Sequence, residues 1–169
     1  DTLVPYPSFG EYADRFPNAT TYDPHTSLAD LRSTIMATTP TRVILVNPNN
    51  PSGTLHGTAA LVDLFTEMPK VQFIVDESFL PFTTEPSVVD LERVLGTNVV
   101  VISSLSKTLG VPGLRIGYAW SKDLGLINRY RGELPIWATN SVAEQVISLL
   151  PKFKNEYQQS LRRSAVDKS

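Results

Sequence analysis

The residues best suited to bind a ligand or to catalyse a reaction lie in the segment VVVISSLSKTLGVPGLRIGY, at positions 99–118. It begins with a β-branched apolar run, which is typical of a buried strand, and then turns polar at once. The hydroxyls of Ser104 and Ser106 and the guanidinium of Arg115 suit a phosphate group, because a guanidinium can bind two phosphate oxygens together. Lys107 is then free for another task, and a loop lysine of this kind can act as a Schiff-base nucleophile.

Lys107 also has an ordinary interpretation. A lysine in a loop is usually a solvated surface charge. Here, however, serines precede the lysine, glycines follow it, and the whole group comes directly after a predicted core strand. This setting favours a functional role over a purely solvated one.

Asp76 follows a second apolar run, VQFIV at positions 71–75. An aspartate at the end of a strand is commonly a turn or cap residue. Alternatively, its carboxylate could pair with a protonated ring nitrogen of a cofactor, which would keep the ring cationic and able to withdraw electrons. Both interpretations are open at this point.

The remaining candidates are Asn50 and Phe9. Asn50 lies in the loop NPNNPSG, which follows the apolar run RVILV at positions 42–46. Its amide could bond a ring hydroxyl, although asparagine, proline and glycine also form ordinary tight turns. Phe9 could stack on a flat cofactor ring or could be a core residue, as most phenylalanines are.

These residues require elements that bring them together. Strands are predicted near the N-terminus and at 20–23, 42–46, 71–75, 99–102 and 116–120, and helices at 9–16 (with Ser8 as a cap), 28–38, 58–68, 88–95, 122–131, 139–150 and 151–169. Alternating strands and helices at this spacing indicate βαβ units and a largely parallel sheet. Ligands bind at the carboxyl ends of such strands, so the three polar loops should converge on one crevice.

The composition is that of an ordinary globular protein, with 169 residues, 41% of them hydrophobic and 19% charged. A net charge of -2 gives no reason to expect a nucleic acid or an anionic membrane as partner. There is no cysteine, so a disulfide framework and a thiolate metal site are excluded, and His25 and His56 are too far apart in sequence to suggest a zinc site. No apolar run approaches the roughly 20 residues of a membrane span.

Three motifs in this order carry a family resemblance: N-P-N-N-P-S-G, then V-D-E-S-F, then S-S-L-S-K-x-x-G-x-P-G-L-R-x-G-Y. Together they resemble the fold type I pyridoxal-phosphate enzymes, within these the class I/II aminotransferases, and most closely the histidinol-phosphate aminotransferase and threonine-phosphate decarboxylase branch. The resemblance extends from P-S-F-G at 7–10 to the W-x-x-N-S-x-A-E that begins at Trp137. Each motif alone would be weak, but the ordered set is specific.

The resemblance implies a three-layer α/β/α fold with a mostly parallel mixed sheet. Residues 1–150 would be a pyridoxal-phosphate-binding large domain, incomplete at its N-terminus, and residues 151–169 a helix leading towards a missing small domain. It further implies an aminotransferase acting on small amino-acid and keto-acid substrates, a homodimer, and a cytoplasmic location.

The resemblance also implies a role for each candidate. Lys107 would form a Schiff base with pyridoxal 5'-phosphate and later move the α-proton, Asp76 would pair with the pyridinium nitrogen, and Asn50 would hold the ring 3-oxygen. The others would bind the phosphate (Ser104, Ser106 and Arg115) or lie against the ring face (Phe9).

The chain departs from the family pattern at several points. Phe79 stands where the family often has a tyrosine that bonds the ring 3-oxygen, and its absence should alter cofactor chemistry rather than abolish binding. The family's N-terminal phosphate loop and the arginine of its small domain have no counterpart in this sequence. Two alternatives therefore stand beside the aminotransferase: a pyridoxal-phosphate-dependent decarboxylase, and a catalytically inactive fragment with a structural role.

Overall fold

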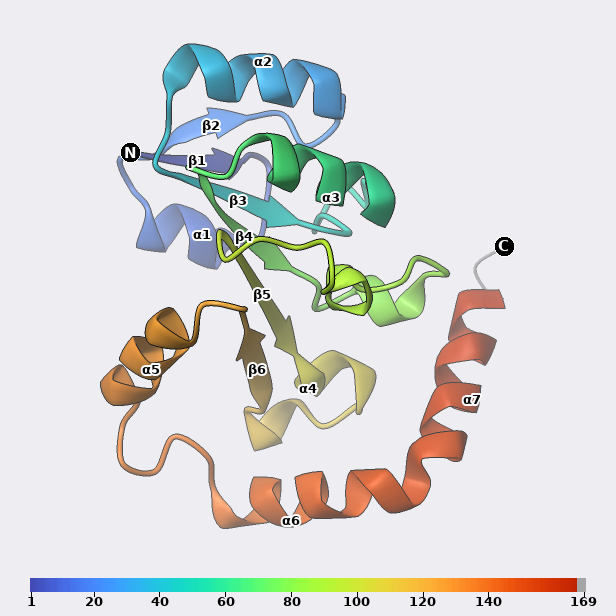
Figure 1. Ribbon diagram of the computed structural model, residues 1–169. Helices are drawn as coiled ribbons and strands as arrows, with labels where there is room; N and C mark the ends of the chain where they lie inside the picture. Colours follow the sequence, from blue (N-terminus) through green and yellow to red (C-terminus); the bar gives the residue numbers. More distant parts are fainter. Residues whose placement is uncertain (167–169) are drawn as a thin grey trace.

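A computed structural model describes residues 1–166 of the chain (Figure 1). The strands are β1 (Thr2–Pro5), β2 (Thr20–Tyr22), β3 (Arg42–Val46), β4 (Gln72–Asp76), β5 (Val99–Ser104) and β6 (Gly117–Trp120). The helices are α1 (Gly10–Arg15), α2 (Leu28–Thr38), α3 (Thr58–Glu67), α4 (Leu105–Thr108), α5 (Leu124–Glu133), α6 (Ser141–Leu149) and α7 (Lys154–Val166). Short 3-10 turns lie at η1 (Leu80–Phe82), η2 (Val88–Leu91), η3 (Pro112–Leu114) and η4 (Leu150–Phe153).

The strands form one sheet in the order β2-β1-β3-β4-β5-β6. Every neighbouring pair is parallel except β5 and β6, which are antiparallel. The predicted mostly parallel mixed sheet is therefore confirmed. β3 and β5 are mostly buried, as their continuous apolar runs indicated, whereas β4 buries Phe73 and Val75 and leaves its other residues half-buried.

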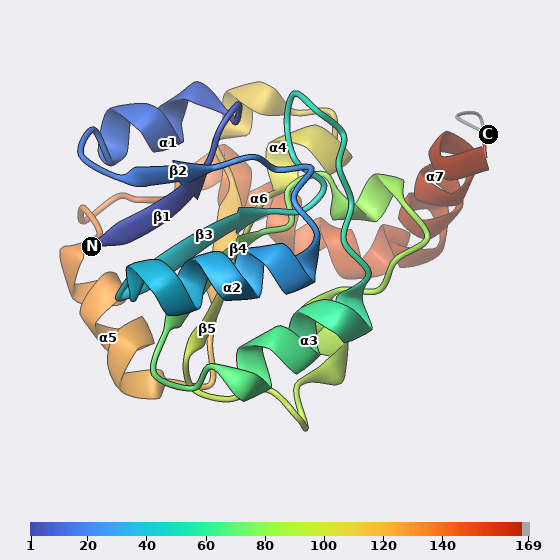
Figure 2. The same cartoon turned by 90° about the horizontal axis from the view of Figure 1, so that it is seen from above.

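Helices cover both faces of the sheet, which gives the expected three layers (Figure 2). On one face, α2 and α3 bury side chains such as Leu31 and Phe65 against Phe73 and Val101 in the main core cluster. On the other face, Tyr12 of α1 and the residue after that helix, Phe16, pack on a smaller cluster. Successive residues of a strand point to opposite faces, so β1, β3 and β4 each contribute to both clusters.

Two details of the predicted helices differ from the structure. Ser8 was predicted to cap the helix at 9–16, but α1 begins after Phe9 and has no side-chain cap, whereas α2 is capped by Ser27, whose side chain accepts from the N–H of Asp30. The predicted helix 88–95 is wrong, because only the turn η2 forms there. The Lys122 ammonium donates to the carbonyls of Glu92 and Leu95, at 2.9 and 3.0 Å, in the segment that follows this turn.

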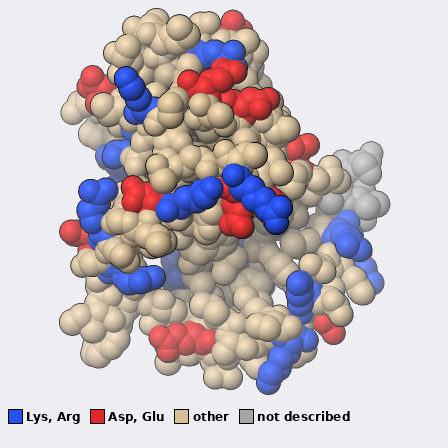
Figure 3. Space-filling view, in the orientation of Figure 1, with Lys and Arg blue, Asp and Glu red and all other residues tan. Residues whose placement is uncertain are grey.

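After β6 the chain runs along the outside of the molecule through α5, α6 and α7 (Figure 1). Asn140 caps α6, because its side chain accepts a hydrogen bond from the N–H of Ala143. The loop before it exposes Ile136 and Trp137, at 95% and 89% of their surface. Within residues 1–166, no helix has the length and apolar character to cross a membrane. Acidic and basic side chains are interspersed over the face in Figure 3.

The predicted domain boundary near residue 150 coincides with the change from α6 to η4 and α7. Nothing in the structure tests whether this point separates two domains, so the boundary stays a prediction. The last three positions of the predicted C-terminal helix, 167–169, lie outside the described residues.

Candidate active site

One edge of the sheet collects all the predicted site residues. The parallel strands β1, β3, β4 and β5 end at this edge, and the antiparallel β6 begins there. Phe9 follows β1, Asn50 lies in the loop after β3, and Asp76 is the last residue of β4. The segment that carries Lys107 and Arg115 connects the end of β5 to the start of β6. The topology therefore brings to one edge residues that lie far apart in the sequence.

Asp76 is half-buried and held by two hydrogen bonds. The Tyr12 hydroxyl donates to its Oδ2 at 2.5 Å, and the N–H of Ser78 donates to its Oδ1 at 2.9 Å. Hydrogen bonds to a charged acceptor are about twice as strong as neutral ones, so the pair fixes the orientation of the carboxylate. Burial, followed by the negative charge of Asp76, raises the pKa of Tyr12 far above its ordinary value.

Tyr12 is the site residue that the sequence analysis missed. The ring centroids of Phe9 and Tyr12 are 6.5 Å apart in an edge-to-face arrangement, so the two aromatic residues neighbour each other at the start of α1. Their spacing of three residues was a usable signal, because residues three apart share a helix face. Nothing in the sequence, however, says that this face would meet the end of β4.

The asparagines after β3 have different environments. Asn47 exchanges two bonds with the backbone of His56, and Asn49 donates to the carbonyl of Pro7 at 3.1 Å. Asn50 is half-buried, and its side chain makes no hydrogen bond to the described residues. The loop is therefore organised by its first two asparagines, while the third has its amide unoccupied by the fold.

Two buried polar atoms beside the predicted cofactor contacts lack a partner among the described residues. They are Ser8 Oγ, next to Phe9, and Asn49 Oδ1, next to Asn50. Buried polar atoms are nearly always hydrogen-bonded, so an unpaired pair at one edge of a sheet is consistent with a polar ligand nearby.

Lys107 lies in α4, a helix of four residues that follows β5 directly. Its side chain is exposed, whereas that of Ser106 is buried and that of Ser104 is half-buried. The short helix is followed by Gly110, which has a positive φ of 65° and reverses the chain towards η3. The lysine is thus accessible at the edge where Asp76 lies.

Arg115 is also exposed and adopts a left-handed backbone conformation, with φ at 53°. Within the described residues, its guanidinium makes one long bond, to the Pro112 carbonyl at 3.5 Å. The next residue, Ile116, accepts a bond from the N–H of Leu105 at 3.0 Å. Arg115 is therefore adjacent to the start of the lysine helix, with its charged group available to an anion.

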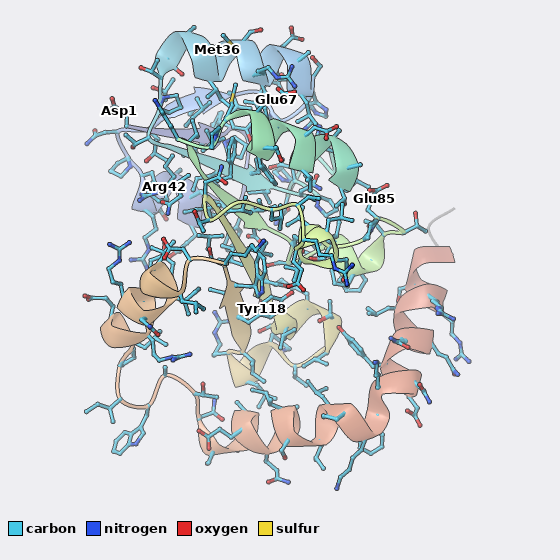
Figure 4. All side chains as sticks on the ribbon, in the orientation of Figure 1. Asp1, Met36, Arg42, Glu67, Glu85 and Tyr118 are labelled. Carbon is cyan, nitrogen blue, oxygen red and sulfur yellow. The ribbon has the colours of Figure 1, made fainter. Side chains whose placement is uncertain are left out.

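Glu77 points to the opposite face from Asp76 and is 3% exposed. Its carboxylate accepts from the Ser87 hydroxyl at 2.5 Å and from the Val88 N–H at 2.9 Å. Burial raises the pKa of Glu77 despite these bonds. Tyr118 lies on β6 (Figure 4), and burial, followed by smaller effects that include the charge of Glu77, raises the pKa of its phenol. Glu77 thus anchors the loop after β4 rather than facing the predicted cofactor.

The family model for aminotransferase class I and II matches residues 6–163. The chain belongs to this family. Its members are pyridoxal-phosphate-dependent enzymes and include both aminotransferases and decarboxylases.

Relatives of both kinds are similar to this chain. Histidinol-phosphate aminotransferase 2 of Haemophilus influenzae is 37% identical over 53% of the chain and 26% of its own length. L-serine phosphate decarboxylase of Campylobacter jejuni is 33% identical over 70% of the chain and 32% of its own length. The crystal structure of L-threonine-O-3-phosphate decarboxylase from Porphyromonas gingivalis superimposes with a TM-score of 0.83 and 26% identity, covering 96% of this chain and 50% of that one. The chain therefore spans half or less of each of these proteins.

The residues present fit pyridoxal 5'-phosphate. Three groups along one edge match this cofactor in chemical character. The carboxylate of Asp76 suits the ring nitrogen, the accessible amine of Lys107 suits the aldehyde, and the guanidinium of Arg115 suits the phosphate. Phe79, which stands where the family often has a tyrosine, pairs with Phe82, with their ring centroids 6.5 Å apart.

We expect Tyr12→Phe to lower the free energy of unfolding by about 1.5–3 kcal/mol, because the variant loses a bond to a charged acceptor. Urea unfolding at pH 7 measures the change. Tyr6→Phe is the matched control, since Tyr6 is 66% exposed and should lose almost nothing. Equal losses in the two variants would contradict a specific role for the Tyr12–Asp76 bond.

Glu77→Gln should gain stability relative to the native chain as the pH rises above about 4.5, the ordinary pKa of glutamate. The pKa of Glu77 is raised in the folded state. As the pH rises, Glu77 therefore loses its proton more readily in the unfolded protein than in the folded one, and the native protein loses stability. Glutamine resembles the protonated acid and does not titrate. Unfolding free energies at several pH values from 4 to 8 test this, and a constant difference between the two proteins would contradict it.

Proposed function

We propose that this chain provides the cofactor-binding and lysine-bearing part of a pyridoxal-phosphate-dependent aminotransferase that acts on an amino acid or a similar amine. The observation that carries the proposal is the placement of Asp76, Lys107 and Arg115 at the carboxyl edge of β4 and β5. The family match supports it. A homodimer and a cytoplasmic location, both expected from the resemblance, remain predictions.

In this proposal each residue has one task. Lys107 holds the cofactor through its amine and moves the α-proton of the substrate, and Asp76, oriented by Tyr12, pairs with the ring nitrogen. The bound cofactor supplies a cationic ring that stabilises negative charge at the substrate α-carbon. Asn50 binds the ring 3-oxygen and Phe9 lies against the ring face. The phosphate is bound by Ser104, Ser106 and Arg115.

A decarboxylase is the second candidate. It is favoured by the similarity to L-serine phosphate decarboxylase and by the superposition on L-threonine-O-3-phosphate decarboxylase. The same lysine and carboxylate serve both reactions, because the choice depends on which bond of the substrate is held perpendicular to the ring. The groups described here do not orient the substrate, so they favour neither reaction.

Pyridoxal 5'-phosphate followed by borohydride should attach covalently to Lys107, because this amine is accessible at the edge where Asp76 lies. Peptide mapping by mass spectrometry locates the label. Lys107→Ala should remove it, whereas Lys70→Ala, a change at an exposed lysine in the turn before β4, should retain it. Label spread evenly over the lysines would count against the proposal.

Arg115→Ala should weaken the binding of pyridoxal 5'-phosphate about tenfold and leave the binding of pyridoxal unchanged, because only the phosphate needs the guanidinium. Fluorescence titration with both compounds measures the difference. Arg129→Ala, at an exposed position of α5, is the control. An equal effect on the two compounds would show that Arg115 does not bind the phosphate.

The two candidate reactions give different products. For a protein that joins this chain to the remaining parts of a family member, the aminotransferase proposal predicts conversion of an amino donor to its keto acid without release of carbon dioxide. Coupled assays for keto acid and for labelled carbon dioxide distinguish the outcomes. Carbon dioxide release that depends on Lys107, with no keto acid, would favour the decarboxylase.

A further inference from the structure

Ser78 joins two parts of the site that are separate in the sequence. It is half-buried and lies two residues after Asp76, to whose Oδ1 its backbone N–H donates at 2.9 Å. Its hydroxyl oxygen accepts a hydrogen bond from the N–H of Ser104, also at 2.9 Å. Bonds from this one residue therefore reach the carboxylate and the end of β5.

The bond between Ser104 and Ser78 links β5 to the β4 side beyond the last paired residues of these two strands. The β4–β5 register ends with Asp76 opposite Ile102, and the N–H of Glu77 donates to the Ile102 carbonyl at 2.9 Å. After Glu77 the chain leaves the sheet, so the N–H of Ser104 lies beyond the backbone hydrogen bonds that join β4 to β5. An unpartnered backbone N–H at this half-buried position would be unfavourable, and the Ser78 hydroxyl supplies the acceptor that β4 does not.

The bond matters because the helix that follows is too short to place itself. The α4 helix has four residues, and Ser104 does not cap it through its own side chain. A helix of this length gains little from its own hydrogen bonds, so its direction depends on flanking anchors. Two anchors hold its entry: Ser78 from the β4 side, and the Ile116 carbonyl, which accepts from the Leu105 N–H at 3.0 Å.

We infer that Ser78 is a positioning residue that holds the Lys107 helix at a fixed place relative to the Asp76 carboxylate. It acts through Ser104 and is not itself a catalytic residue. The inference rests on the proposed function, in which Lys107 and Asp76 bind the same cofactor. One cofactor molecule can bind Lys107 and Asp76 together only if the distance between them is constant. The two hydrogen bonds of Ser78 connect the Asp76 carboxylate to the start of the Lys107 helix and so hold that distance.

The experiment compares Ser78→Ala, which removes the acceptor, with Ser78→Thr, which retains a hydroxyl. The matched control is Ser121→Ala at the other end of β5. The Ser121 hydroxyl is buried, donates to the Val99 carbonyl at 2.7 Å and accepts from the Asp123 N–H at 3.2 Å. For each protein, the dissociation constant of pyridoxal 5'-phosphate, the melting temperature without cofactor, and the fraction of borohydride-fixed label on Lys107 are measured.

Ser78→Ala should raise the dissociation constant about fivefold, as expected for the loss of one hydrogen bond that orders a binding group. It should also move label from Lys107 to other lysines. Ser78→Thr should stay within twofold of the native protein, and Ser121→Ala should lower the melting temperature without changing affinity. Native affinity in Ser78→Ala, or an equal loss of affinity in Ser121→Ala, would overturn the inference.

Failure of the proposed function gives a different result. In that case the native protein itself shows no preference for Lys107, before any variant is compared, and the inference is overturned together with the function. If the native protein is labelled at Lys107 and Ser78→Ala is labelled equally, only the positioning role is wrong.

Discussion

The parallel hydrogen-bond ladder from β3 through β4 to β5 is the constraint on which the rest of the structure depends. Its register places Val46 opposite Asp76 and Asp76 opposite Ile102, so the three strands end side by side. Each strand turns into a polar loop at that point. Because backbone bonds set the register, the loops meet without needing any attraction between their own side chains. The candidate site is a consequence of where the ladder stops.

The alternation of side chains along β4 separates two carboxylates that are adjacent in the sequence. Asp76 lies on the face of α1, where Tyr12 binds it, and Glu77 lies on the opposite face, where Ser87 and Val88 bind it. A shift of one residue in the register would exchange the two groups. Burial raises the pKa of Glu77, whereas Asp76 is held in place by two hydrogen-bond donors, the Tyr12 hydroxyl and the Ser78 N–H.

The lysine helix illustrates how a weak element acquires a definite position. Four residues of helix have little stability of their own, but α4 is bonded to the loop after β4 on one side and to the residue before β6 on the other. These bonds come from segments at positions 78 and 116, far from each other in the chain. The accessible amine of Lys107 is therefore supported by the sheet rather than by its helix.

The sequence by itself determined the strands β3, β4 and β5, the mostly parallel sheet and the three polar loops, because apolar runs and turn residues are local signals. It also carried the ordered motifs that indicate the family. Only the tertiary structure decided that Tyr12 binds Asp76 and that Ser78 reaches Ser104, because each contact joins segments that no local pattern connects. The helix predicted at 88–95 is only the turn η2, whose start is held by the carboxylate of Glu77, a residue that the local pattern of 88–95 does not include.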